Sequence, residues 1–277
     1  MAQADIEKQA PTSSWRVTKV TAEGAINSPD VLAREEPLEI RVNGQSIAVT
    51  MRTPGHDEEL AAGFLWTERL IARPESLISI GHCPGKTEEE RENIVLAYVD
   101  GASGALEEGW QRNFPASSSC GICGKASIEA VRQAAEPIQS DIRVASNILH
   151  GLPKTLRQAQ DTFDRTGGLH AAGLFDSEGD LILLREDVGR HNAVDKMVGA
   201  ALFRKMLPLE DSLVLVSGRA GFEIVQKCLL AGVPIVAAVG APSSLAVELA
   251  AESGMTLVGF LRENSMNVYT GAERVLA

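Results

Sequence analysis

The sequence predicts an α/β fold in which helices cover both faces of a layered, mixed sheet and a smaller, mainly antiparallel part precedes it. From His170 onward, short apolar runs alternate with segments of helical periodicity, as in layered α/β proteins. Near the N-terminus, strand-like segments flank Asn43-Gly44, a hairpin signal. The 277 residues, 44% hydrophobic and only 4% aromatic, can form one large or two small domains with an aliphatic core.

The chain is expected to have four parts: a disordered tail at 1–14, a β-rich subdomain at 15–115, a mobile cysteine loop with a helix at 116–140, and an α/β core at 141–277. In the β-rich subdomain, Asn43-Gly44 supplies the positive φ angles of a type I′ turn. A helix is predicted where Leu60 and Phe64 share one face and acidic residues occupy the first turn. The predicted elements of this part are strands at 15–22, 38–42, 46–51 and 93–99, and a helix at 56–71.

In the core, apolar runs shorter than eight residues predict buried strands, and longer segments with apolar residues at helical spacing predict helices. Ser146 is expected to cap the helix predicted at 146–163. The predicted elements are helices at 125–135, 146–163, 190–205, 222–231 and 244–253, and strands at 171–175, 181–184, 213–216, 235–239 and 256–261. This alternation predicts a sheet with a large parallel component.

The charge and hydropathy pattern excludes several classes of protein. The 26 basic and 37 acidic residues give a net charge of −11, which disfavours nonspecific nucleic-acid binding but leaves room for a nucleotide ligand. No apolar stretch approaches the roughly 18–20 residues of a membrane span. The N-terminal residues lack the apolar region of a secretory signal, so a cytoplasmic location without membrane attachment is expected.

The four cysteines do not predict a disulfide framework in a chain of this length in a reducing compartment. Cys228 lies in an apolar segment and is predicted to be core, and Cys83 is interpreted as an incidental loop thiol. Cys120 and Cys123 differ, because they form a Cys-x-x-Cys pattern ahead of a predicted helix.

Free backbone N–H groups at a helix start and the charge of Lys125 favour the thiolate form of these cysteines, and only the thiolate accepts or passes on sulfur. Gly121 and Gly124 leave room for a partner to approach. A mobile thiol of this kind suits a persulfide carrier, which must enter the active sites of both a donor and an acceptor.

Three other interpretations of Cys120 and Cys123 remain open. Half of a structural zinc site is one, although the chain has no second Cys-x-x-Cys or spaced histidine pair to complete it. A dithiol redox site is another, but the pattern follows a serine run and not a βαβ strand. The third is a purely structural turn, which does not require two cysteines.

Polar residues gather where predicted strands meet loops or helices in the core. Such junctions bind ligands in open α/β sheets, and a strand followed by a helix start can hold an anion. Phe260 and Arg262 follow the last long strand and are candidates to stack on a base or clamp a phosphate. The candidate binding residues are Gly168, His170, Asp187, Arg190, His191, Asn192, Ser217, Arg219, Phe260, Leu261, Arg262, Glu263, Asn264 and Ser265.

Together these junctions predict a pocket for a large nucleotide-like ligand. His191 and Asp195 are expected to share one helix face, as are Asn192 and Lys196, because they are four residues apart. Asp187 and His191 are the candidates for a general acid or base. A solvated helix start with ordinary ion pairs is the alternative for this cluster.

The chain resembles the formate dehydrogenase accessory sulfurtransferase family, the FdhD-type sulfur carriers, over roughly residues 40–274. The resemblance rests on several motifs in one order: Arg52 to Asp57, Ser119 to Gly124, Thr166 to His170, Glu186 to Lys196, Ser217 to Arg219 and Gly259 to Arg262.

This resemblance implies a core similar to cytidine deaminases, with residues 141–277 binding the cofactor. It implies that Cys120 carries a persulfide received from a cysteine desulfurase, with help from Cys123. The sulfur would pass to bis-molybdopterin guanine dinucleotide, the molybdenum cofactor, before insertion into the catalytic subunit of formate dehydrogenase. Residues 260–265 match the segment where the family binds the guanine dinucleotide, and the family tends to form homodimers.

Two further hypotheses stay open beside the sulfur carrier. One is a cofactor chaperone that binds the guanine nucleotide without carrying sulfur. The other is a zinc deaminase, which needs His-x-Glu followed by Pro-Cys-x-x-Cys. Here His170 is followed by two alanines and the cysteine pair precedes it, so no structural metal is expected.

Overall fold

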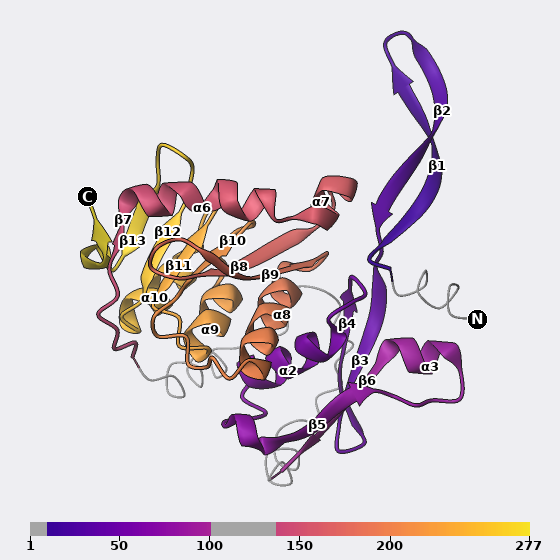
Figure 1. Ribbon diagram of the computed structural model, residues 1–277, viewed down its shortest axis with the longest axis horizontal. Coiled ribbons are helices and arrows are strands. Elements are labelled where there is room, and N and C mark those ends of the chain that lie inside the picture. Colours follow the sequence, from indigo (N-terminus) through magenta and orange to yellow (C-terminus); the bar gives the residue numbers. More distant parts are fainter. Residues whose placement is uncertain (1–9, 101–136) are drawn as a thin grey trace.

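A computed structural model of the chain describes residues 10–100 and 137–277 (Figure 1). Cys120, Cys123, Lys125 and the helix predicted at 125–135 lie outside these residues. The described part contains a six-stranded sheet with helices on both faces, a four-stranded sheet packed beside it, and a two-stranded arm. The predicted α/β class is therefore confirmed.

The central sheet is mixed, as predicted. Its strands are, in spatial order, β13 (Asn267–Thr270), β12 (Thr256–Gly259), β11 (Ile235–Ala238), β10 (Leu213–Val216), β8 (His170–Phe175) and β9 (Leu181–Asp187). The pairs β10–β11 and β11–β12 are parallel, whereas β8 runs antiparallel to both of its neighbours and β13 antiparallel to β12. The sequence predicted five of these strands and missed only the exposed edge strand β13.

Two helical layers enclose this sheet (Figure 1). One face is covered by α8 (Arg190–Phe203), α9 (Phe222–Leu230) and α10 (Ser244–Glu252), and the other by α6 (Ser146–Gln158). Alternate residues of β10 point to opposite faces of the sheet. Val214 and Val216 pack with the three helices, whereas Leu213 and Leu215 pack with α6. A strand buried on both faces has this unbroken apolar sequence.

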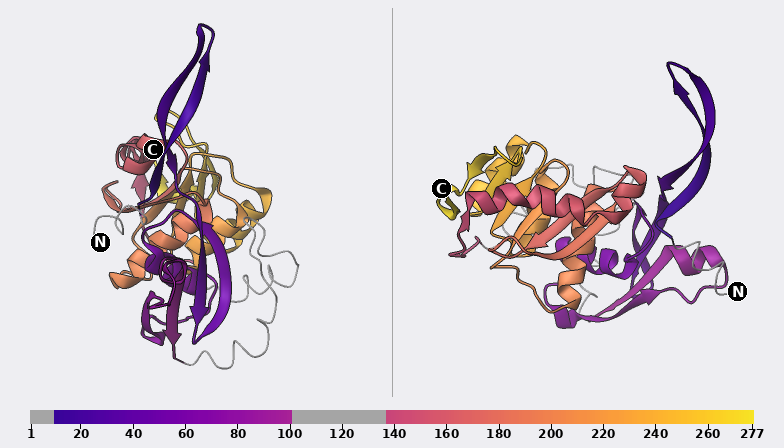
Figure 2. Two further views of the ribbon diagram at one scale, coloured as in Figure 1. Left: turned by 90° about the vertical axis from the view of Figure 1, so that its right-hand side faces the viewer. Right: turned by 45° about the horizontal axis from the view of Figure 1, so that its top comes forward.

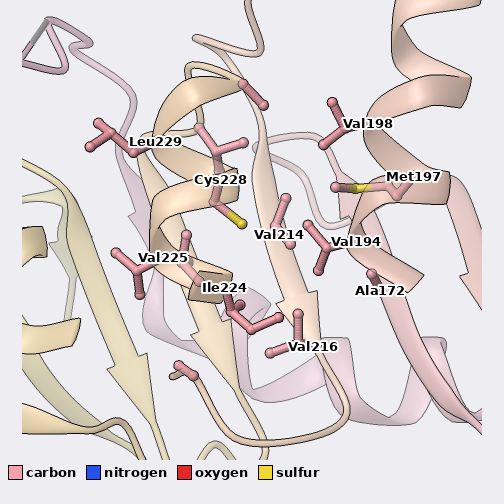
Figure 3. Close-up of a cluster of buried hydrophobic side chains, with 14 of the residues drawn as sticks. Ala172, Val194, Met197, Val198, Val214, Val216, Ile224, Val225, Cys228 and Leu229 are labelled. Atoms are coloured by element: carbon pink, nitrogen blue, oxygen red, sulfur yellow. The ribbon is translucent and has the colours of Figure 1, made fainter. Parts of the chain in front are cut away.

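Cys228 belongs to the larger of these cores, where it lies among side chains of α8 and β10 such as Val194, Met197 and Val214 (Figure 3). Its exposed fraction is 0%, and burial raises the pKa of its thiol to about 12. The prediction that Cys228 is a core residue is confirmed. Cys83 is partly exposed.

The single helix predicted at 146–163 is wrong, because the chain forms two helices here. After α6 the chain breaks and starts α7 (Asp161–Thr166). The carboxylate of Glu186, on β9, accepts hydrogen bonds from the backbone N–H groups of Thr162 (3.1 Å) and Phe163 (2.9 Å) and so caps this second start. Ser146 is not the predicted cap: the N-cap position is Ala145, without a side-chain bond.

The four-stranded sheet has the order β4 (Gln45–Arg52), β3 (Glu36–Val42), β6 (Ile94–Val99) and β5 (Leu77–His82). The β3–β4 and β5–β6 pairs are antiparallel, and β3–β6 is parallel. Asn43 and Gly44 have φ angles of 49° and 87°, which confirms the predicted hairpin turn. The helix predicted at 56–71 is confirmed as α2 (Asp57–Thr67), which ends earlier.

The remaining short elements are α3 (Glu88–Asn93), η1 (Pro74–Ser76), η2 (Ala272–Arg274), and β7 (Val144–Ala145), which pairs with β14 (Val275–Leu276).

Helix α2 joins the two sheets by crossing α8 at unusually short range. A Cβ atom added at Gly199 would lie 1.8 Å from the carbonyl oxygen of Glu59, and one added at Gly63 would lie 1.8 Å from that of Asp195. The two backbones are thus in direct contact, which only glycine permits at these positions.

The arm is formed by β1 (Thr12–Thr21) and β2 (Gly24–Ala33), which pair antiparallel and extend away from the body (Figures 1 and 2). The strand predicted at 15–22 is confirmed, but it begins at Thr12, inside the segment 1–14 that was expected to be disordered. None of the helices in the described ranges is long and apolar enough to cross a lipid bilayer.

Candidate functional site

The polar junctions of the core meet along one edge of the six-stranded sheet. His170 begins β8 opposite Asp187, which ends β9. Because β8 is antiparallel to β10, the start of β8 lies beside the end of β10, where Ser217 follows. The loops after β11 and β12 emerge at the same edge, because these strands run parallel to β10. The sequence predicted that these loops would meet at one edge if the strands were parallel.

Hydrogen bonds tie these loops to one another. Ser217 accepts from the N–H of Ala171 through its hydroxyl (2.9 Å) and donates its own N–H to the carbonyl oxygen of Ala171 (2.9 Å). The N–H of Gly240 donates to the carbonyl of Gly218 (2.8 Å), and that of Phe260 to the carbonyl of Gly240 (3.0 Å). The edge from β8 to β12 is therefore one connected surface.

Basic side chains occupy the β8 end of this surface. The ring of His170 lies against Gly218, where an added Cβ atom would be 3.3 Å from Nδ1. Burial lowers the pKa of His170, and the positive charge of the neighbouring Arg190 lowers it further. Arg219 is exposed beside it. Two guanidinium groups and an imidazole at this end of the surface suit an anionic ligand.

His191, on α8, interacts with a residue at the start of the neighbouring helix α9. Its Nε2 lies 2.8 Å from Oε2 of Glu223 on α9. This hydrogen bond is the main reason that the pKa of Glu223 is lowered. His191 and Asp195, which were expected to share one helix face, have different partners, because Asp195 points into the interior and contacts Lys227.

The segment 260–265 closes the other end of the surface. Phe260 has a φ of 52°, a left-handed conformation that is costly for a large side chain, and the residue is 44% exposed. Leu261 is fully buried and anchors the turn. Nη1 of Arg262 donates to the carbonyl of Val239 (2.6 Å), while Glu263, Asn264 and Ser265 are exposed.

Asp187 and Asn192 lie at this edge but point into the protein. The exposed fraction of Asp187 is 0%, and its carboxylate accepts from the N–H groups of Thr53 (3.1 Å) and Gly189 (2.8 Å), from Asn192 Nδ2 (3.0 Å) and from Lys196 Nζ (2.7 Å). Both carboxylate oxygens of Asp187 are thus bound by groups of the described chain in this conformation.

Asn192 and Lys196 do share one helix face, as expected, and both complete this junction. Asn192 Nδ2 also donates to the carbonyl of Met51 (2.7 Å), and Lys196 Nζ to the carbonyl of Thr53 (2.7 Å). Two of the motifs read from the sequence, 52–57 and 186–196, therefore bind one another. The sequence did not reveal this role of Thr53 and Lys196, although both motifs carry charges that need buried partners.

The motif 52–57 also lines a cavity at the start of α2. Arg52, 1% exposed, forms two hydrogen bonds to Asp57 of 3.0 and 2.9 Å. His56 has a φ of 59°, and its Nδ1 lies 3.2 Å from Glu59. A cavity of about 310 Å³ opens beside these residues, with a wall formed by Phe203.

Glu59 predicts a specific change of stability with pH. Burial disfavours its charge, but hydrogen bonds from Arg185 and His56 outweigh burial and lower its pKa from 4.5 to about 2. A lowered folded-state pKa adds stability above the unfolded value, and this is lost as pH falls from 4.5 through 2. Glu59→Gln should therefore unfold more easily than the wild type at pH 6, by roughly 1–2 kcal/mol.

Urea unfolding at pH 6 and pH 3 checks this: the difference between wild type and Glu59→Gln should shrink at pH 3. The exposed Glu178→Gln is the control and should stay within about 0.5 kcal/mol of wild type at both pH values. A difference that is the same at both pH values would contradict the prediction.

A buried ionic cluster joins α2, α8 and α9. Lys227 Nζ lies 3.0 Å from both Asp195 Oδ2 and Glu68 Oε1 and donates to the hydroxyl of Thr67 (2.9 Å). Burial opposes its charge, but the two carboxylates outweigh burial and raise the pKa of Lys227. This cluster fixes the helices that carry the candidate site.

Comparison with known proteins gives one consistent family. A sequence model of the FdhD/NarQ family matches residues 33–276. The chain is 53% identical over 268 residues to a protein of Mycolicibacterium paratuberculosis named sulfur carrier protein FdhD, covering 95% of this chain and 98% of that protein. It is 54% identical over 259 residues to one of the same name from Streptomyces coelicolor, covering 91% and 92%.

A solved structure shares the fold. This is a crystal structure of a protein assigned as a formate dehydrogenase accessory protein from Desulfotalea psychrophila. The TM-score is 0.77 at 27% sequence identity, and the match covers 96% of this chain and 100% of that one.

Proposed function

Because the chain belongs to the FdhD/NarQ family, we propose that it is a sulfur carrier that serves formate dehydrogenase in the cytoplasm. It accepts sulfur from a cysteine desulfurase as a persulfide on Cys120 and passes it to bis-molybdopterin guanine dinucleotide. This substrate then enters the catalytic subunit of formate dehydrogenase. The observation that carries the proposal is the match to sulfur carrier proteins over nearly their whole length, with the Cys120-Gly-Ile-Cys123 pattern inside it.

In the first step, the thiolate of Cys120 attacks the outer sulfur of the desulfurase persulfide. The S–S bond of the donor breaks, its electron pair stays on the donor cysteine as a thiolate, and the new S–S bond forms on Cys120. In the second step the acceptor supplies the electron pair for the bond to the terminal sulfur, and Cys120 leaves as a thiolate. Both steps need an ionised, accessible thiol, and Cys123 is the neighbouring group proposed to assist them.

The connected edge of the central sheet supports the binding of a large anionic substrate. Arg190 and Arg219 supply positive charge at one end, and the exposed ring of Phe260 offers a stacking surface at the other. His170, whose ring lies against Gly218, adds a hydrogen-bonding group at the same edge. Asp187 and Asn192 stabilise this edge from the protein interior, because the carboxylate of Asp187 hydrogen-bonds to Gly189 N–H and to Asn192 at the start of α8.

The proposal predicts where sulfur is loaded. After incubation with a cysteine desulfurase and cysteine, the intact mass of the protein should rise by one sulfur atom in the wild type and in Cys123→Ala. It should not rise in Cys120→Ala, because the proposal assigns the persulfide to Cys120 and only an assisting role to Cys123, and Cys228 is buried with a raised thiol pKa. The partly exposed Cys83 provides the matched control, since Cys83→Ala should load sulfur like the wild type.

A wild-type protein that gains no sulfur, or a Cys120→Ala variant that gains it fully, would overturn the proposal. If Cys120→Ala also kept full activation of formate dehydrogenase, the chain would act as a cofactor chaperone without a covalent step.

A further inference from the structure

The turn formed by residues 260–265 begins with a residue in a strained conformation. Phe260 has a φ of 52° and is 44% exposed. A bulky residue keeps a left-handed backbone only where its surroundings determine that conformation. The bonds that fix this turn therefore decide where the ring of Phe260 points.

Backbone bonds attach the turn to the central sheet. The N–H groups of Phe260 and Leu261 donate to carbonyl oxygens at the end of β11 and just after it (3.0 Å each). The N–H of Arg262 donates to the carbonyl of Ser265 (2.8 Å), which closes the turn. These bonds anchor the turn on the side of β11.

The side chain of Arg262 stabilises the turn as well. Its Nη1 donates to the carbonyl oxygens of Val239 (2.6 Å) and Leu261 (2.8 Å). One end of this guanidinium group is thus bound to the backbone of the turn and of the neighbouring loop.

His150 binds the same turn from α6, on one face of the sheet. Its Nδ1 lies 2.7 Å from the carbonyl oxygen of Arg262, although the two residues are 112 positions apart in the sequence. A carbonyl oxygen only accepts, so Nδ1 carries the hydrogen and donates it. The adjacent Leu149 is 0% exposed and packs in the same core as Leu261, which fixes the position of His150 relative to the turn. His150 lies outside every motif that the sequence singled out.

We propose that His150 is a positioning residue for nucleotide binding. Its bond to the carbonyl of Arg262 keeps the turn in the conformation that presents Phe260 to a guanine base. His150 acts through the turn and not by touching the ligand, and it reduces the conformational freedom that binding would otherwise have to remove. This inference rests on the proposed binding of a guanine nucleotide at this edge of the sheet.

The loss of one hydrogen bond sets the size of the expected effect. The net contribution of a hydrogen bond within a protein corresponds to about a three- to tenfold change in an equilibrium constant. Without the bond from His150, the turn spends less time in the conformation that binds, and the apparent affinity falls by that fraction.

Calorimetric titration of the full chain with guanosine diphosphate tests this role. His150→Leu keeps similar bulk but has no donor, so it should raise the dissociation constant about three- to tenfold. His150→Asn should stay within about twofold of the wild type, because its Nδ2 is attached to Cγ, like Nδ1 of histidine, and can donate from the same position. Gln158→Ala, exposed at the end of α6, is the control and should bind like the wild type.

A double-mutant cycle tests whether His150 acts through Phe260. Phe260→Ala should weaken the binding of guanosine diphosphate. Adding His150→Leu to this variant should weaken binding no further, because the ring that His150 positions is gone. A general loss of packing would instead lower the affinity by the same factor in both backgrounds.

Four outcomes would each overturn the inference: a wild type that does not bind guanosine diphosphate, wild-type affinity in His150→Leu, an Asn variant as weak as the Leu variant, or additive effects in the cycle. Sulfur loading of Cys120, followed by intact mass, is a separate readout, and His150→Leu should load like the wild type. If neither protein gained sulfur while the nucleotide results held, the proposed sulfur transfer would fail and the role of His150 would stand.

Discussion

Replacing Lys196 with methionine is expected to lower the free energy of unfolding by about 3–5 kcal/mol, because it removes one partner of a buried ion pair. Lys196 is 1% exposed, and its Nζ lies 2.7 Å from both Asp187 Oδ2 and the carbonyl of Thr53. Methionine fills similar space but carries no charge or N–H donor. Asp187 would stay buried without its only cationic partner in the described part of the chain, and the carbonyl of Thr53 would lose its donor.

Denaturant unfolding at pH 7 checks this change, with the slope of the transition compared between variants. The control is Lys154→Met, on the exposed side of α6, which should change stability by no more than about 0.5 kcal/mol. A loss below about 1 kcal/mol for Lys196→Met would show that water or another cation reaches Asp187.

Gly199→Ala is expected to destabilise the protein by about 1–3 kcal/mol or more, although alanine favours helices over glycine by up to about 1 kcal/mol. The added methyl group would lie 1.8 Å from the carbonyl oxygen of Glu59 on α2. Backbone atoms cannot move aside as a side-chain end can, so α2 and α8 must separate. That separation would also strain the neighbouring contacts of Asp195 and Lys227.

The same substitution at Gly151 should have the opposite sign. Gly151 lies within α6, and a Cβ atom added there would meet no other atom within 4 Å. Gly151→Ala should therefore raise stability by about 0.5–1 kcal/mol. Thermal unfolding of both variants measures the contrast. A stabilising effect at Gly199 would contradict the close crossing of the two helices.

The strands and helices of the core could be predicted because each has one dominant signal. The β10 and β11 segments are short runs of Val, Leu, Ile and Ala between loops, and the structure starts both strands where the sequence placed them. The Asn43-Gly44 turn was predictable from its backbone requirement alone. Elements without such a signal were missed: β2 contains Gly24, Asn27, Pro29 and Asp30, none of which favours strands.

The candidate site was predictable in position but not in the direction of its side chains. The rule that parallel strands end at one edge brought Ser217 and Phe260 to the same surface as His170. The sequence does not tell whether a polar residue at a helix start faces a ligand or another part of the chain. Asp187 and Asn192 face the segment 50–53 because tertiary contacts more than 130 residues apart decide their orientation. The expected roles of Cys120 and Cys123 remain predictions.

The shared carboxylate of Asp187 has a consequence for how the molecule melts. Thr53, which follows the N-terminal sheet, and Lys196 of α8 both bind the carboxylate of Asp187. Separation of the N-terminal part from the core would therefore leave buried polar groups without their partners. Calorimetry should therefore record a single cooperative heat-absorption peak. A truncated fragment of residues 137–277 should fail to reach the native state by itself, since Asp187 and Lys196 would lose the groups of Thr53 that complete their shell.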